Sequence, residues 1–438
     1  MDLLVKSRRM VLPEGVRPAS LHVRDGRIAA VGRHDAALAG ARLIDAGDDA
    51  VLPGLVDTHV HVNQPGRSEW EGYCTATEAA AAGGITTIVD MPLNSVPVTT
   101  TLRALREKQA ALRGERISCD VALWGGVVPG NVAELEPMAQ AGALGFKCFL
   151  IDSGIEEFRW VGEGDLRPAM RELARMGSTL LVHAEVQGPM REPRGDPRAY
   201  RTYLESRPRA SENEAVALAA RLCRETRART HIVHHSSADA LETVRSVRRE
   251  GLPFSAETCP HYLFFAAEEI PDGRTEFKCA PPIRERDNRE ALWAALADGT
   301  LEMVVSDHSP CAPALKKLEQ GRFDEAWGGI SGLQLSLAVT FTEAAKRGRG
   351  LGEIARWMSE APARLAGLSA RKGALRAGCD ADFVIFDPEA SFTVDPARLR
   401  HRHKLTPYAG RELRGKVKQV FLRGEDALET PRGEELRR

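Results

Sequence analysis

Runs of apolar residues alternate with polar or alanine-rich stretches from about residue 53 to residue 362. Eight runs have the length and the near-continuous apolar character of strands that are buried on both faces. They are Leu55–Val62, Ile85–Met91, Val121–Val128, Ala143–Leu150, Thr179–Glu185, Thr230–His235, Leu252–Thr258 and Glu302–His308. Helical stretches such as Leu102–Leu112 and Glu212–Thr226 separate them. This alternation predicts an α/β fold, a (β/α)8 TIM barrel; a doubly wound open sheet would alternate in the same way, but it has no reason to stop at eight strands.

The two ends of the chain have a different, β-rich pattern. Leu21–Gly32 consists of two apolar runs joined by the dipeptide Asp25-Gly26, which predicts a hairpin. Near the other end, Ala381–Phe386 has the composition of a buried strand. The N-terminal segment is too short to hold a good core by itself.

These patterns predict two domains. We expect residues 1–52 and 363–438 to join in one small β-sandwich domain, and residues 53–362 to form the barrel. The last residues, 429–438, are polar, and we expect them to fray.

Composition narrows the possible partners and the compartment. The chain of 438 residues has 60 basic and 61 acidic residues and a net charge of −1, which argues against nucleic acid and membrane surfaces as partners. The eight cysteines form no C-x-x-C pair, and no apolar run reaches the ~18–20 residues of a membrane span. The N-terminus lacks the features of a signal peptide. We therefore expect a cytoplasmic protein with free thiols.

Polar residues follow or end several of the predicted strands. His59 and His61 lie one residue apart on the first strand, so both imidazoles point to the same face. Lys147 lies on the fourth strand, His183 ends the fifth, and Asp307 ends the eighth. Singly, each could be a core histidine, a paired lysine or a helix-capping aspartate. Together, at the end of a barrel where active sites lie, they indicate a metal site.

The sixth strand offers His231, His234 and His235 as further candidates. His234 and His235 point to opposite faces, and so do His231 and His234, because side chains alternate along a strand. Spacing alone leaves the choice among them open.

Lys147 is unexpected in a metal site, because an ammonium group repels cations. A desolvated lysine has a lowered pKa and can be neutral, and a neutral amine can react with carbon dioxide to form a carbamate. The carbamate would bridge one ion held by His59, His61 and Asp307 and a second ion held by His183 and a histidine of the sixth strand. A hydroxide between two divalent ions would be a nucleophile at neutral pH, and Asp307 would carry its proton to a leaving nitrogen.

Longer motifs carry a family resemblance. PGLVDTHVH, GFKCFL, VHAE, HIVH, SDHSPC and KGALRAGCDADFVIFDP together resemble the cyclic amidohydrolases of the amidohydrolase superfamily. The resemblance implies a (β/α)8 barrel with a small β domain from both termini, a homotetramer, and two divalent metal ions bridged by a carboxylated lysine. The implied ligands are His59, His61, Lys147, His183, His234 and Asp307. Zinc is the expected metal, although such ligands also accept cobalt, manganese, nickel or iron.

Within this family, the stretches from Pro65 to Ser95 and AWGGISGLQ resemble the allantoinase branch. That resemblance implies hydrolytic opening of the allantoin ring to allantoate in purine catabolism. The dihydroorotase branch fits less well, because Asn63, Cys311 and Gln334 stand where it usually has Arg, His and a different motif residue. A hydantoinase or dihydropyrimidinase is a further alternative. A non-catalytic relative is a remote one, since such relatives usually lose the ligands.

Two asparagines are candidates for substrate binding. Allantoin has no carboxylate, but its ureido arm could accept and donate hydrogen bonds to a neutral amide such as Asn63. Asn94, in the loop after the second strand, and the stretch Trp327–Gln334 are expected to shape the pocket, because loops at this end of a barrel carry specificity.

Overall fold

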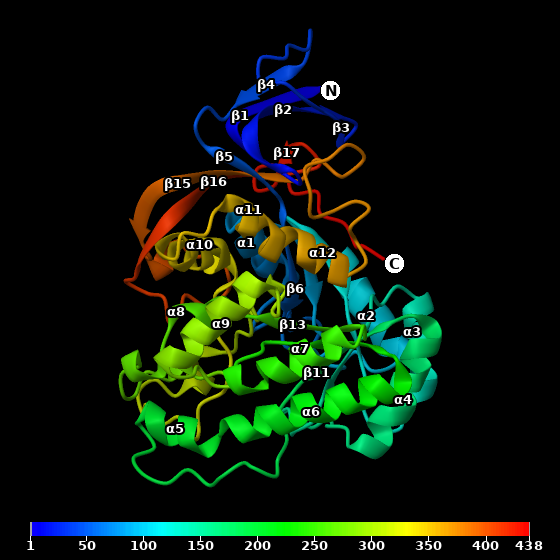
Figure 1. Ribbon diagram of the computed structural model, residues 1–438, viewed down its shortest axis with the longest axis vertical. Helices are drawn as coiled ribbons and strands as arrows, with labels where there is room; N and C mark the ends of the chain where they lie inside the picture. Colours follow the sequence, from blue (N-terminus) through cyan, green and yellow to red (C-terminus); the bar gives the residue numbers. More distant parts are fainter. Residues whose placement is uncertain (1, 438) are drawn as a thin grey trace.

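Three β-sheets organise residues 2–437, the part of the chain that the computed structural model describes (Figure 1). The largest is a mixed sheet in the order β17-β16-β15-β5-β1-β2-β3, with β4 added beside β1. Its strands are β1 Leu3–Leu12, β2 Gly15–Arg24, β3 Arg27–Gly32, β4 Arg42–Asp45, β5 Ala50–Pro53, β15 Phe383–Thr393, β16 Glu412–Leu422 and β17 Glu425–Asp426.

Strands from both ends of the chain share this mixed sheet. β15 pairs antiparallel with β5, with Phe383 opposite Pro53 and Phe386 opposite Ala50. Between β2 and β3 the chain turns at Asp25 (φ 51°) and Gly26 (φ 75°), the positive φ values of the hairpin that the dipeptide predicts. The sheet lies at the top of Figure 1, where its blue and orange-red strands meet.

The other two sheets are parallel and lie below it, surrounded by helices (Figure 1). One has the order β6-β7-β8 and the other β14-β13-β12-β11-β10-β9. Their strands are β6 Leu55–Val60, β7 Ile85–Asp90, β8 Asp120–Leu123, β9 Gly125–Gly126, β10 Phe146–Phe149, β11 Thr179–His183, β12 Arg229–Ile232, β13 Phe254–Thr258 and β14 Met303–Val304. Nearly all their residues are buried, as the continuous apolar runs predict.

Helices α1 to α9 lie between the parallel strands along the chain, and α10 to α12 follow the last of them. The longer ones are α1 Tyr73–Ala82, α2 Leu102–Arg113, α3 Val132–Gln140, α4 Glu163–Met176, α6 Arg209–Thr226, α7 Leu241–Arg249, α9 Arg286–Asp298 and α10 Ser336–Lys346. The shorter ones are α5 Tyr200–Ser206, α8 Pro260–Phe264, α11 Leu351–Ala355 and α12 Ala361–Leu365. The α/β fold with parallel sheets is thus confirmed.

The parallel sheets meet at both of their edges. Only Trp124 separates β8 from β9, and its backbone N–H donates to the carbonyl of Asp90 (2.9 Å). At the far side, Val60 of β6 forms a parallel bridge with His308, which follows β14.

The structure corrects two expectations. The eighth strand is shorter than Glu302–His308: β14 ends at Val304, and Asp307, with a positive φ of 44°, lies in the turn that follows. Residues 433–437 do not fray: the N–H of Leu436 donates to the carbonyl of Val121 (2.8 Å), and the Leu436 side chain is buried in the cluster around Trp124. One apolar residue thus anchors a polar tail; Arg438 lies outside the described residues. Among residues 2–437, no helix is long and apolar enough to cross a membrane.

Candidate metal centre

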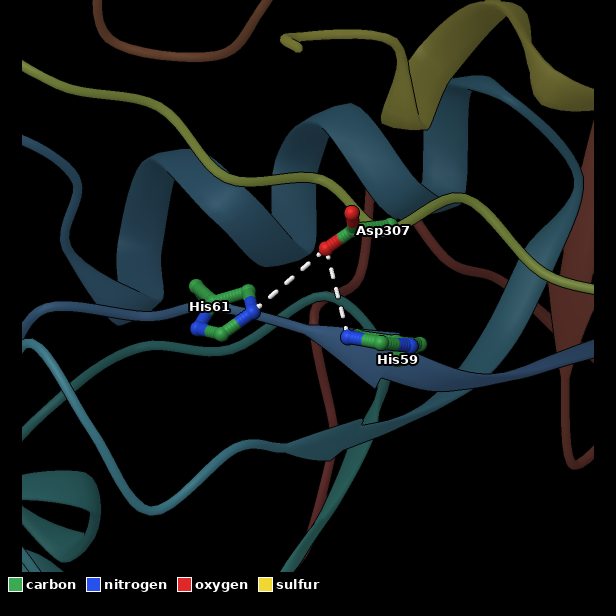
Figure 2. A group of neighbouring side chains, drawn as sticks. All are labelled: His59, His61 and Asp307. Atoms are coloured by element: carbon green, nitrogen blue, oxygen red, sulfur yellow. Dashed lines mark ion pairs between the residues drawn. The ribbon is translucent and has the colours of Figure 1, made fainter. Parts of the chain in front are cut away.

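His59, His61 and Asp307 form a compact buried group (Figure 2). Asp307 Oδ1 lies 3.2 Å from His59 Nε2 and 3.5 Å from His61 Nε2. His59 lies on β6, His61 just beyond it, and Asp307 follows β14. Each of the three offers one possible ligand atom, and these atoms lie within 4.8 Å of one another.

A buried carboxylate holds these segments together. Asp57 accepts hydrogen bonds from the N–H of Ser306 (3.0 and 3.2 Å) and from the N–H of His59 (3.1 Å). The end of β6 is thereby held beside the turn that carries Asp307, although 249 residues separate Asp57 from Ser306.

Lys147, on β10, reaches the same group. Its Nζ lies 3.0 Å from His59 Nε2, and the residue is almost completely buried. Burial lowers the pKa of Lys147 to about 8, since desolvation disfavours the ammonium form.

His183 and His234 form the neighbouring pair. His183 Nδ1 lies 2.9 Å from His234 Nε2, and the rings of His59 and His234 are 5.2 Å apart. The other two histidines of the sixth strand bind elsewhere: His235 Nε2 donates to the Ser237 carbonyl, and His231 contacts Ser255 and Glu257. The structure therefore places His234 in the group, the choice that spacing leaves open.

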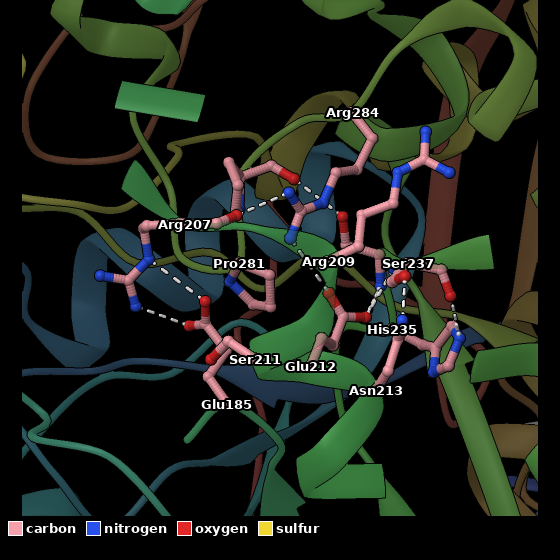
Figure 3. Close-up of polar contacts among 12 residues, drawn as sticks. Glu185, Arg207, Arg209, Ser211, Glu212, Asn213, His235, Ser237, Pro281 and Arg284 are labelled. Carbon is pink, nitrogen blue, oxygen red and sulfur yellow. Dashed lines mark hydrogen bonds and ion pairs between the residues drawn. The ribbon is translucent and has the colours of Figure 1, made fainter. Parts of the chain in front are cut away.

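Two carboxylates lie behind the histidines. Glu257 Oε1 is 2.6 Å from His59 Nδ1, and Glu185 Oε2 is 2.9 Å from His183 Nε2. Arg207 forms two bonds to Glu185, 2.7 and 3.1 Å long (Figure 3). Burial alone would raise the pKa of Glu185, but Arg207 and His183 outweigh it and bring the pKa to about 2.

The donor atoms suit a divalent cation. Burial lowers the pKa of His61 to about 4 and the pKa values of His59 and His234 well below their usual range, so these imidazoles are neutral. Glu257 accepts the proton of His59 Nδ1, so Nε2 has a lone pair that faces Lys147 Nζ and the Asp307 carboxylate. Burial opposes ionisation of Asp307, yet its hydrogen bond with His61 brings its pKa below the usual value. Lone pairs that face each other across about 3 Å are stabilised by a cation between them.

A cavity of about 310 Å³ opens above this group. Asn94 lines it, with a φ of 73°, and so does Trp327 with the two glycines that follow. Asn63 is buried outside the lining, and its Nδ2 donates to the carbonyl of Pro310 (3.3 Å). The wall includes residues that sequence reasoning did not single out: Phe149, Asp152, Ser153, Tyr203, Arg207, Lys278 and Ser309. Phe149 and Ser309 belong to the motifs GFKCFL and SDHSPC, whereas the other five lie outside the quoted motifs, so no local pattern indicated those five.

A second acidic group already has its cation. Asp120, Asp380 and Asp382 lie together, and Lys372 Nζ is 2.5, 2.9 and 2.6 Å from their carboxylates. Arg423, 2.8 Å from Asp120, and Arg371, 2.9 Å from Asp380, supply the remaining positive charge, so this group joins the mixed sheet to β8.

Comparison with known proteins agrees with the site. Residues 50–426 match the model of the amidohydrolase family. The allantoinase of Streptomyces avermitilis is 52% identical, with 97% of this chain and 95% of the relative covered. The allantoinase of Arabidopsis thaliana is 43% identical over 96% of this chain and 87% of the relative.

Solved structures of similar fold include proteins named hydantoinase or dihydropyrimidinase. An L-hydantoinase (dihydropyrimidinase) from Arthrobacter aurescens superposes with a TM-score of 0.93 at 32% identity, covering 100% of both chains. A dihydropyrimidinase from Brevibacillus agri gives 0.89 at 27% identity, with 100% and 99% covered. The fold and the buried histidine–aspartate group define a hydrolase with a candidate metal centre. The chain belongs to the amidohydrolase family, and the resemblance to its allantoinase branch is confirmed by these relatives.

Proposed function

We propose that the chain is an allantoinase, which opens the ring of allantoin by hydrolysis and releases allantoate in purine catabolism. The observation that carries this proposal is the 52% identity to a curated allantoinase over nearly the full length of both chains. The buried histidine–aspartate group beneath a cavity of about 310 Å³ supports it, because hydrolysis of an amide requires an activated water beside the substrate.

We propose that two divalent metal ions, zinc by preference, bind at this group. His59, His61 and Asp307 would hold one ion, His183 and His234 the other, and a carboxylated Lys147 would bridge them. The short distances among these side chains support the assignment. When bound, such ions lower the pKa of water and polarise the scissile carbonyl.

Asp307 is the proposed general base and acid. Its pKa lies below the usual range, so it is ionised and can accept a proton at Oδ1. It can then deliver that proton to the nitrogen that leaves when the ring opens. The left-handed turn at φ 44° presents the carboxylate to the cavity floor.

Asn94 is the proposed contact for the ureido arm of the substrate, since it lines the cavity and offers both a donor and an acceptor. Asn63 would act less directly: it holds the Pro310 segment, three residues after Asp307, through its amide.

We further propose that the two parallel sheets close into one eight-stranded barrel within residues 53–362, in which β8 and β9 count as a single strand interrupted at Trp124. The Trp124 junction and the Val60–His308 bridge support closure. Residues 1–52 and 363–438 would form the separate small β domain. A homotetramer in the cytoplasm completes the proposal, and the eight free cysteines agree with a reducing compartment.

A hydantoinase-type activity is the second candidate, favoured by the structural similarity to the hydantoinase of Arthrobacter aurescens. The deciding experiment measures hydrolysis of allantoin, hydantoin and dihydroorotate side by side on metal-analysed protein. We expect allantoin to be hydrolysed with the highest kcat/KM and the activity to vanish in Lys147→Ala. If only hydantoin is hydrolysed, the assignment as a hydrolase stands, but the proposed substrate, allantoin, is wrong.

A further inference from the structure

A chain of buried hydrogen bonds leads from His59 away from the cavity. Glu257 Oε1 lies 2.6 Å from His59 Nδ1, and Glu257 Oε2 lies 2.9 Å from His231 Nε2. His231 Nδ1 lies 2.7 Å from the hydroxyl of Ser255. His59, His231 and Glu257 are completely buried, whereas Ser255 is half-buried and lines a second recess of about 340 Å³.

The strands impose this arrangement. Ser255 and Glu257 lie two residues apart on β13, so both side chains point to the same face. His231 is the register partner of Ser255 on the neighbouring β12. His59 lies on β6, in the other parallel sheet, and 198 residues separate it from Glu257.

One assignment of hydrogens satisfies every bond in the chain. A carboxylate only accepts, so Glu257 receives one proton from His59 Nδ1 and another from His231 Nε2. His231 Nδ1 then accepts from the Ser255 hydroxyl. The result leaves His59 Nε2 without a proton, facing Asp307.

The second carboxylate–histidine pair has a different charge balance. Glu185, behind His183, is neutralised by the guanidinium of Arg207 (Figure 3). Glu257 has no such cation among its hydrogen-bond partners in residues 2–437, because its partners are two imidazoles and the backbone N–H of His234. The charge of Glu257 therefore acts on whatever cation His59 binds.

We infer that Glu257 and His231 are positioning residues for the ion held by His59, His61 and Asp307. Glu257 selects the tautomer of His59 and fixes its ring, and its negative charge strengthens binding of that ion; His231 holds Glu257 in place. The inference rests on the proposed metal centre. Neither residue touches the substrate, so both act through His59.

The test measures binding of Zn²⁺ alone to metal-free protein, in competition with a chromophoric chelator. The variants are Glu257→Gln, which keeps the size of the side chain but removes its charge, His231→Leu, and His231→Gln, which restores a donor. The matched control is His235→Leu, since His235 is equally buried but bonds to the Ser237 carbonyl instead (Figure 3).

We expect the Kd of the tighter Zn²⁺ to rise ~10–100-fold in Glu257→Gln and in His231→Leu. His231→Gln should recover part of the loss, and His235→Leu should leave the Kd within ~2-fold of the parent. The visible spectrum of the Co²⁺ form should change in Glu257→Gln and not in His235→Leu. Circular dichroism establishes that each variant is folded, and Glu257→Gln decides the matter if His231→Leu does not fold.

The outcomes separate the two proposals. A parent protein that binds no Zn²⁺ contradicts the metal centre and this inference with it. If the parent protein binds two ions and folded Glu257→Gln binds Zn²⁺ with the same Kd as the parent, the role of Glu257 and His231 is overturned. The proposed metal centre then stands. An equal rise in His235→Leu would also overturn it, because the loss would then come from general damage to the core.

Discussion

Carbon dioxide is the reagent that tests the bridging role of Lys147. Burial lowers the pKa of this lysine from 10.5 to about 8, so at pH 7 its amine is ~9% neutral, against ~0.03% for an ordinary lysine. The reactive form is therefore ~300-fold more abundant than on the surface. The neutral amine forms an N–C bond to carbon dioxide and loses a proton, which leaves an anionic carbamate.

The rate of reactivation should rise with pH, because only the neutral amine of Lys147 reacts with carbon dioxide. At a fixed concentration of dissolved carbon dioxide and excess Zn²⁺, the rate at which metal-free protein regains activity should rise about tenfold from pH 6 to pH 7. It should level off above pH 8, where Lys147 is mostly neutral.

The assay combines recovery of activity with carbon-13 NMR on protein treated with labelled carbon dioxide. One labelled carbamate is expected, and Lys147→Ala should abolish it. Lys108 is the internal control: it is also buried, but its Nζ forms an ion pair with Asp90 (2.9 Å), so it should stay unlabelled. Full recovery in buffer free of carbon dioxide, or a rate that does not change between pH 6 and pH 8, would refute the reasoning.

Three further predictions concern stability, the cavity wall and the metal. Lys372→Met removes the cation that three buried aspartates share, although Arg423 still pairs with Asp120 and Arg371 with Asp380. It should lower the free energy of unfolding by about 3–5 kcal/mol, measured by denaturant titration; unchanged stability would contradict the role of Lys372 in joining the sheets. Trp327→Ala removes the edge-to-face contact with Trp70 (5.3 Å) and should raise KM ~3–10-fold with little change in kcat, whereas an unaltered KM would exclude Trp327 from the substrate wall. Dialysis against a chelator should abolish hydrolysis and added Zn²⁺ should restore it; activity that survives complete metal removal would be incompatible with the proposed centre.

Much of the fold follows from local patterns. The apolar runs predict the parallel strands to within a few residues, and Asp25-Gly26 predicts the hairpin, because backbone periodicity and turn preferences are properties of short segments. The prediction that the C-terminal tail frays was wrong, because the polar composition of a segment does not show that one of its residues, Leu436, packs into a distant apolar cluster.

Local patterns also predicted some residues of the candidate site and not others. His59 and His61 were predictable because their spacing puts both on one face of a strand, and Asp307 because it ends an apolar run.

The role of Glu257 was not predictable, since it depends on a hydrogen bond with His59, 198 residues away. The sequence by itself determined the elements, the family and the residue types available for chemistry. Spacing left His231, His234 and His235 open, and the family resemblance implied His234; the tertiary structure shows that His234 lies beside His183 while His231 and His235 bond elsewhere. Only the tertiary structure decided which carboxylate lies behind each histidine. Contacts between sheets depend on packing over long range, which no local pattern encodes.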